Sequence, residues 1–223
     1  MIVQIYTLQS VEEALEVESV GVHNIGLAPA SIGLPGEISY ETAKSICDEV
    51  QNSKTVALSV SNNIEEIIEM VMFVKPDILH LCGEPGELNA SRVKILRDRL
   101  QRTDKGIPIM QAISVEDMSA VEFAKEYEDV SDYFILDTST SLVQGVGASG
   151  KVHDWNVSKA IVDFVKIPVI LAGGLSPENV RDAIEKVKPW GVDSLTHTNK
   201  ILDNGDFVKD ITKVRKFFKN ATG

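Results

Sequence analysis

A pair of glycines, Gly173 and Gly174, has the residue types of an anion-binding turn. The pair follows an apolar run at 168–172 and precedes Ser176 and Pro177, a cap residue and a proline that together predict the start of a helix. Glycines let the backbone approach an anion closely, and amide N–H groups at such a turn supply donors. The pattern therefore predicts a phosphate site, with a simple chain reversal as the alternative.

Three side chains suited to proton transfer stand at the ends of other apolar runs. Asp137 lies at the end of the run 133–138, and His80 and Cys82 stand two residues apart in the run 77–82. Residues two apart in a strand share a face, so His80 and Cys82 are candidates for a proton-transfer couple. The alternative for this pair is ordinary burial, since cysteine is among the most commonly buried residue types.

The elements that position these residues alternate along the chain. Short β-branched apolar runs predict strands at 2–7, 23–28, 55–60, 77–82, 107–113, 133–138, 168–172 and 192–196. Amphipathic segments predict helices at 11–20, 39–50, 64–74, 90–100, 118–128, 155–165, 177–187 and 206–218. Eight strand–helix units in 223 residues predict an α/β fold, a (β/α)8 TIM barrel that forms a single domain over residues 1–223. The first strand is not followed by Gly-x-Gly-x-x-Gly, which disfavours a dinucleotide-binding sheet.

A closed barrel places its active site where the C-terminal ends of the strands meet the loops. That rule gathers the three titratable residues at one end, together with Tyr6 from the first strand. Thr196 and His197, at the end of the eighth strand, join the glycine pair because the loops after strands seven and eight of this fold frequently hold a phosphate. A Schiff-base mechanism is disfavoured because three lysines precede strands, namely Lys54, Lys75 and Lys166.

Charge and cysteine content narrow the class of partner. The formal net charge is -11, so the surface has no basic footprint for nucleic acid or an anionic membrane. A phosphorylated metabolite must then be held by local backbone donors.

Two cysteines, Cys47 and Cys82, do not suggest a disulfide framework, and no apolar run approaches the roughly 20 residues of a membrane span. We expect a soluble cytoplasmic protein, monomeric or homodimeric.

Three motifs resemble, in order and spacing, those of the phosphoribosylanthranilate isomerase family. The family pattern is an aspartate on strand six, a Gly-Gly-(Thr/Ser)-Gly loop that leads to Phe-Asp-Trp, and Gly-Gly-Leu-x-Pro-Glu-Asn-Val. The corresponding segments here are Leu136-Asp137-Thr138, Gly147-Ala148-Ser149-Gly150-Lys151-Val152-His153-Asp154-Trp155 and Leu171-Ala172-Gly173-Gly174-Leu175-Ser176-Pro177-Glu178-Asn179-Val180. The resemblance extends more loosely over nearly the whole chain.

The resemblance implies an Amadori rearrangement of tryptophan biosynthesis that uses no metal and no organic cofactor. An acid protonates the sugar ring oxygen, and a base removes the proton from C2. By the resemblance, Asp137 is the acid. Gly147, Ser149 and Gly150 belong to a substrate loop, and Gly173 and Gly174 lie at the phosphate.

Several positions depart from the family pattern. Tyr6 stands where the family has its basic cysteine, and a tyrosine of ordinary pKa, about 10, is a poor base at neutral pH. The loop 29–37, where the family arginine that binds the aromatic carboxylate would fall near Gly36, contains no arginine or lysine. Thr196 and His197 replace a serine and a glycine of the phosphate loop. The base stays open among Tyr6, Cys82 and His80.

These departures favour a divergent family member that isomerises another phosphorylated sugar or sugar derivative, with Asp137 as general acid. One alternative is the authentic tryptophan-pathway isomerase with an unusual base. A second alternative is a catalytically inactive barrel that binds a phosphorylated metabolite.

Overall fold

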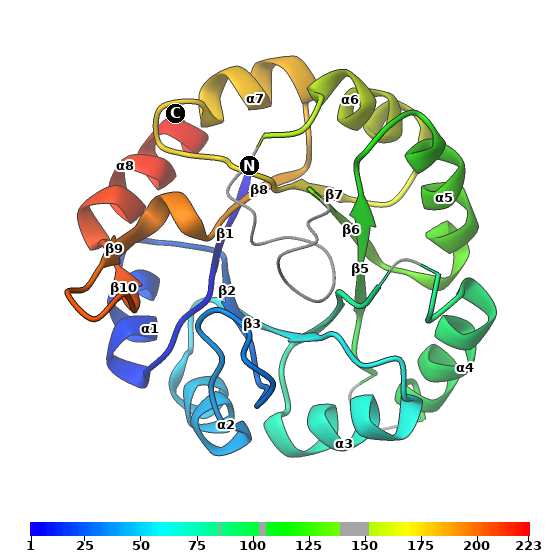
Figure 1. Ribbon diagram of the computed structural model, residues 1–223, viewed down its shortest axis with the longest axis horizontal. Helices are drawn as coiled ribbons and strands as arrows, with labels where there is room; N and C mark the ends of the chain where they lie inside the picture. The colour runs from blue at the N-terminus through cyan, green and yellow to red at the C-terminus, as the bar shows by residue number, and fades with distance from the viewer. Residues whose placement is uncertain (85, 103–105, 139–151) are drawn as a thin grey trace.

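The computed structural model describes residues 1–84, 86–102, 106–138 and 152–223 of the chain. Eight parallel strands close into a barrel in the order β1 to β8, and β8 pairs with β1 (Figure 1). The strands are β1 (Ile2–Tyr6), β2 (Asn24–Leu27), β3 (Lys54–Ser59), β4 (Ile78–Leu81), β5 (Ile109–Ser114), β6 (Tyr133–Asp137), β7 (Val169–Leu171) and β8 (Gly191–Ser194). The predicted (β/α)8 barrel is confirmed.

The helices form an outer ring around these strands (Figure 1). They are α1 (Val11–Glu18), α2 (Tyr40–Glu49), α3 (Ile64–Val74), α4 (Ala90–Leu100), α5 (Ser119–Tyr127), α6 (Trp155–Phe164), α7 (Val180–Val187) and α8 (Ile211–Thr222). Two 3-10 turns, Glu128–Val130 and Thr196–Thr198, follow α5 and β8. Among the described residues, no helix combines the length and the hydropathy that a membrane crossing needs.

Alternation along each strand divides the buried side chains into two sets. On β6, Phe134 and Leu136 pack outward in the large cluster between strands and helices, whereas Ile135 packs in a smaller cluster in the barrel interior. Asp137 follows Ile135 by two residues, so it shares the inward face. The same rule places Tyr6 and Cys82 inside, where both belong to the interior cluster.

The interior cluster depends on a glycine of β2. Tyr6 pairs with Gly26 across the β1–β2 ladder, and a Cβ added at Gly26 would lie 2.3 Å from Cγ of Tyr6. The Tyr6 ring therefore lies flat against the bare backbone of Gly26. From there its hydroxyl reaches Nδ1 of His80 on β4, at 2.8 Å.

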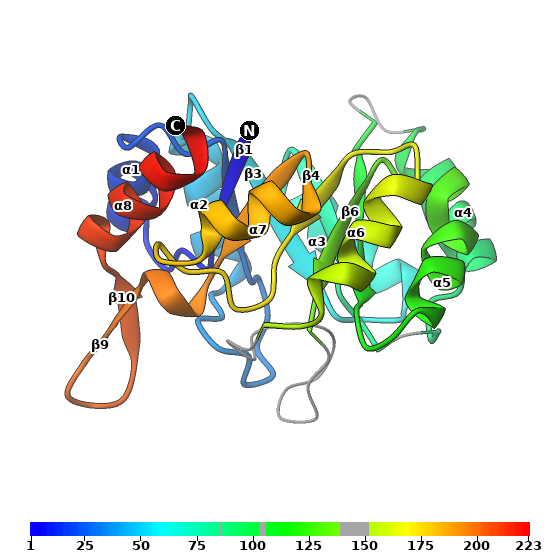
Figure 2. The ribbon, with the colours of Figure 1, turned by 90° about the horizontal axis from the view of Figure 1, so that it is seen from above.

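The segment after β8 differs from the sequence-based expectation of a helix at 206–218. Residues Asn199–Ile201 (β9) and Phe207–Lys209 (β10) form an antiparallel hairpin that extends away from the barrel (Figure 2). Gly205 adopts a φ of 90° in the turn, which a glycine permits without strain. The last helix starts only after Asp210, whose carboxylate accepts the N–H groups of Thr212 and Lys213.

We expect Gly26→Ala to lower the free energy of unfolding by about 1–3 kcal/mol, because the new methyl group overlaps the Tyr6 ring. Urea unfolding of the variant measures the loss. In a Tyr6→Ala background the same change meets open space, so its cost should shrink. Equal costs in the two backgrounds would show that Tyr6 does not need the bare backbone.

Candidate active site

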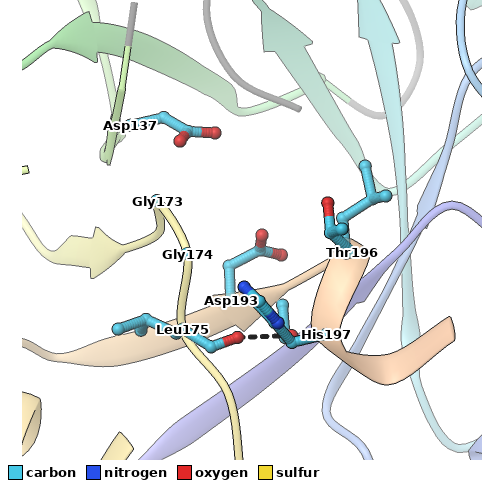
Figure 3. Close-up of a pocket in the computed structure, with 9 residues that line it drawn as sticks. Asp137, Gly173, Gly174, Leu175, Asp193, Thr196 and His197 are labelled. Atoms are coloured by element: carbon cyan, nitrogen blue, oxygen red, sulfur yellow. Dashed lines mark hydrogen bonds between the residues drawn. The ribbon is translucent and has the colours of Figure 1, made fainter. Parts of the chain in front are cut away.

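One pocket at the C-terminal ends of β6, β7 and β8 contains all four predicted phosphate residues together with Asp137 (Figure 3). The cavity itself is small, about 20 Å³, and it opens to solvent. The residues that line it are Asp137, Gly173, Gly174, Leu175, Asp193, Ser194, Leu195, Thr196 and His197. The structure therefore brings the carboxyl group and the glycine turn to the same cavity.

The glycine turn presents backbone donors on one side of this pocket. Gly173 and Gly174 have φ values of 78° and 66°, a conformation that L side chains rarely adopt. Within the described part of the chain, the N–H groups of these two glycines donate to no other residue. The turn is held from behind, because Ser194 Oγ donates to Leu175 O at 2.8 Å (Figure 3). Free amides on a fixed turn suit an anion such as a phosphate.

A histidine supports the turn and the end of β6 together. The side chain of His153 contacts Thr138 Oγ1 through Nδ1 at 3.2 Å and Ser158 Oγ through Nε2 at 2.7 Å. A Cβ added at Gly173 would lie 2.6 Å from Nδ1 of His153. The absence of a side chain at Gly173 is thus required by the protein itself, as well as being useful for an anion.

Asp137 ends β6 with its carboxyl group in the pocket. Its Oδ1 accepts the N–H of Thr138 at 2.7 Å. Burial raises the pKa of Asp137 from 3.8 to about 7, and the hydrogen bond from Thr138 opposes that rise. A carboxyl group that keeps its proton near neutral pH is suited to act as a general acid.

A second carboxyl group, Asp193 of β8, lines the same pocket. Its Oδ1 accepts a hydrogen bond from Nε2 of Gln4 at 3.1 Å, and Oε1 of Gln4 in turn accepts a hydrogen bond from Nδ2 of Asn24 at 3.1 Å. Burial and the charge of Asp137 raise the pKa of Asp193 from 3.8 to about 8, whereas Gln4 and Lys209 lower it. The two carboxyl groups interact, so the pKa values belong to the pair.

The buried side chain of Lys209 connects the end of β1 to the segment that follows β8. Its Nζ donates to the backbone oxygen of Tyr6, to Leu195 O at 3.3 Å and to Asn199 Oδ1 at 2.5 Å. Burial lowers the pKa of Lys209 to about 7, while the charges of Glu13 and Asp193 raise it. Lys209 thus lies close enough to Asp193 for the charges of the two groups to stabilise each other.

The sequence profile of one family, described as N-(5'phosphoribosyl)anthranilate (PRA) isomerase, matches residues 3–220. The chain belongs to this family. It is therefore an isomerase of the intramolecular oxidoreductase type, and the resemblance seen in the sequence is confirmed.

Individual relatives agree with this assignment. The chain is 33% identical to the N-(5'-phosphoribosyl)anthranilate isomerase of Acetivibrio thermocellus over 81% of its own length and 78% of that protein. It is 33% identical to the enzyme of the same name from Methanocella arvoryzae over 70% of its own length and 67% of that protein. The crystal structure of phosphoribosyl anthranilate isomerase from Thermotoga maritima superposes with a TM-score of 0.79, at 28% identity and with both chains fully covered.

Tyr6, at the position of the cysteine in the isomerase family, contacts His80 but does not line the pocket. Both side chains are buried in the barrel interior, as is Cys82. Burial raises the pKa of Tyr6 well above 10.0, and the charges of Asp193 and Cys82 add to that rise. Burial also lowers the pKa of His80 from 6.5 to about 3. The roles of these three residues as bases stay predictions, which their environment does not favour.

Gly36, near which the carboxylate-binding arginine of the isomerase family would fall, has no room for a side chain. A Cβ added at Gly36 would lie 2.5 Å from Thr7 Oγ1 and 2.7 Å from Cζ of Phe207, which comes from the hairpin. The next residue, Glu37, accepts the N–H groups of Ile32, Gly33 and Leu34, each at 2.9 Å, through one carboxylate oxygen. The backbone of this loop is thus held by the carboxylate of Glu37, close to the position where the family has a positively charged arginine.

Sequence reasoning missed Asp193 and Lys209 as members of the site. Alternation along the eighth strand was the signal for Asp193, since it stands two residues before Leu195, another residue of the pocket wall. No local signal pointed to Lys209, because a hairpin carries it back to the barrel.

Three further features of the sequence are the substrate loop, the possible metal ligands and the two cysteines. The substrate-loop residues Gly147, Ser149 and Gly150 lie outside the described residues. In the described ranges, no group of three or more His, Cys, Asp or Glu side chains is arranged to hold a metal ion. Neither Cys47 nor Cys82 takes part in a disulfide.

We expect Asp137→Asn to become more stable relative to the wild type as the pH rises from 4 to 8. A carboxyl group whose folded pKa is raised from 3.8 to about 7 contributes stability that is complete below pH 3.8 and is lost as the pH rises through 7. The slope approaches about 1.4 kcal/mol per pH unit for one proton.

Urea unfolding of both proteins across this pH range measures the difference, and the other titrating groups cancel in the comparison. Parallel curves for the two proteins would show that the Asp137 pKa is not raised.

Proposed function

We propose that this chain catalyses the isomerisation of N-(5'-phosphoribosyl)anthranilate to its 1-deoxyribulose form, with Asp137 as general acid. The observation that carries the proposal is the pocket in which Asp137 faces the glycine turn of Gly173 and Gly174. The names of the relatives support the choice of substrate, since each is an N-(5'-phosphoribosyl)anthranilate isomerase. A cytoplasmic location and a monomeric or homodimeric state stay predictions from the sequence.

The geometry supplies the parts that such an isomerase needs. The free amides of the glycine turn and the exposed side chains of Thr196 and His197 surround the position proposed for the 5'-phosphate. Asp137 lies on the neighbouring strand, in reach of the sugar ring of a substrate held there. A proton delivered to the ring oxygen opens the sugar, which is the first step of the rearrangement.

We expect purified protein to convert N-(5'-phosphoribosyl)anthranilate to the ketose product, and Asp137→Asn to lower kcat about 10²- to 10⁴-fold with little change in KM. Chromatographic product analysis measures both. Rescue of a tryptophan auxotroph that lacks this step provides a test in cells. A wild-type chain that binds the substrate without turnover would instead support the inactive, metabolite-binding alternative.

A second candidate function follows from the loop after β2. Phe207 and Thr7 fill the space beside Gly36, and Glu37 places a negative charge in the same loop. A groove bordered by this loop and the end of β3 is lined by Glu41 and Glu66, and none of the described residues that line it is a lysine or an arginine. These observations favour a phosphoribosyl derivative that lacks the aromatic carboxylate, the hypothesis that the sequence put first.

The two functions differ in how much the carboxylate contributes to turnover. We expect kcat/KM for N-(5'-phosphoribosyl)aniline to fall within about tenfold of that for the anthranilate compound, because no cation of the described loop binds the carboxylate. Steady-state kinetics with the two substrates decide between them. A preference for the anthranilate compound of 100-fold or more would exclude the second candidate.

A further inference from the structure

The proposed isomerisation needs a base at C2, and none of the residues predicted for that role lines the pocket. Among the described residues of the pocket wall, the ionisable side chains are Asp137, Asp193 and His197. Asp137 is the proposed acid, and His197 is exposed at the rim. We propose that Asp193 is the base that removes the C2 proton. This inference rests on the proposed function.

The position of the Asp193 side chain is set by its place on β8 and by hydrogen bonds inside the barrel. Val192 on the same strand packs in the outer core, and the Ser194 hydroxyl bonds to Leu175, so Asp193 alone of these three faces inward. The hydrogen bonds from Asn24 to Gln4 and from Gln4 to Asp193 Oδ1 hold the carboxyl group in place. Figure 3 shows this group directed toward the space that Asp137 also faces.

The groups around the two carboxyls differ in one respect that bears on the negative charge. Each accepts one N–H donor, from Gln4 in the case of Asp193 and from Thr138 in the case of Asp137. Only Asp193 also has the charge of Lys209 acting to lower its pKa. The pKa values of about 7 and about 8 belong to the pair and leave one proton on it near neutral pH. The reaction uses the form in which Asp137 holds that proton and Asp193 is the anion, a form that the charge of Lys209 stabilises. This division gives one acid and one base in one pocket.

The reaction then balances without a further reagent. Asp137 gives its proton to the ring oxygen as the C1–O bond breaks and the nitrogen lone pair forms a C1=N bond. Asp193 takes the C2 proton, the C–H electrons form a C1=C2 bond, and the C1=N electrons return to nitrogen. Asp193 returns its proton to C1 while Asp137 takes the proton of the C2 hydroxyl. The product is the ketose, and both carboxyls regain their starting states.

The closing experiment measures proton exchange separately from turnover. Wild type, Asp193→Asn and Tyr6→Phe are incubated in D₂O with 1-(o-carboxyphenylamino)-1-deoxyribulose 5-phosphate or with its aniline counterpart. Loss of the C1 proton signal by NMR reports the base, and a sample without protein gives the background. Tyr6→Phe keeps the buried ring and removes only the hydroxyl, so it is the matched control.

We expect Asp193→Asn to lower both exchange and turnover at least 100-fold, while Tyr6→Phe stays within about tenfold of the wild type. The acidic limb of the kcat/KM profile should disappear in Asp193→Asn; the charged and titratable groups around Asp193 are Asp137, Lys209, Tyr6 and His197. Matching thermal unfolding and binding of inorganic phosphate show that the variant is folded with its phosphate site intact.

The outcomes separate the two proposals. Exchange of the aniline compound alone, lost in Asp193→Asn, would refute the anthranilate substrate and retain the base. Activity that survives in Asp193→Asn but is lost in Tyr6→Phe would overturn the inference alone. A wild-type chain that exchanges neither compound would overturn both.

Discussion

Two carboxyl groups are buried in one pocket, and the arrangement of the residues around the pocket depends on how their negative charges are stabilised. Two negative charges close together in a poorly solvated site cost free energy unless one is neutralised by a proton or by a cation. Both effects are present here. The pKa values of Asp137 and Asp193 are raised, so the pair retains a proton, and Lys209 lies nearby. The price of this arrangement is stability at neutral pH, which active sites commonly give up for chemistry.

In the barrel interior below the pocket, a packed tyrosine stands where the family has its basic cysteine. A tyrosine replaces the smaller residue that the family places at the end of the first strand, and its ring is accommodated because β2 has a glycine at the paired position. A buried hydroxyl needs a hydrogen-bond partner, and His80 provides one. Tyr6 and His80 therefore form a polar contact inside the barrel, and the groups suited to proton transfer lie on β6 and β8.

The hairpin after β8 connects the acid–base pair to the substrate end of the site. Its second strand, only three residues long, carries Lys209 beside Asp193 and Phe207 against Gly36. This one hairpin thus contributes the charge near the proposed base and fills the space beside Gly36, near which the carboxylate-binding arginine of the family would fall. A change of substrate and a change of base would both follow from this single element.

The sequence by itself determined the barrel, the glycine turn and the position of Asp137, because hydrophobic periodicity and a local turn motif are encoded over a few neighbouring residues. The sequence predicts a helix at 206–218, which wrongly includes the second strand of the hairpin, because Phe207, Val208 and Lys209 are extended only through pairing with residues 199–201. Tertiary structure alone decided that Tyr6 meets His80, and that Lys209 returns to the first strand. Those contacts join residues 74 and 203 positions apart, so no local pattern specifies them.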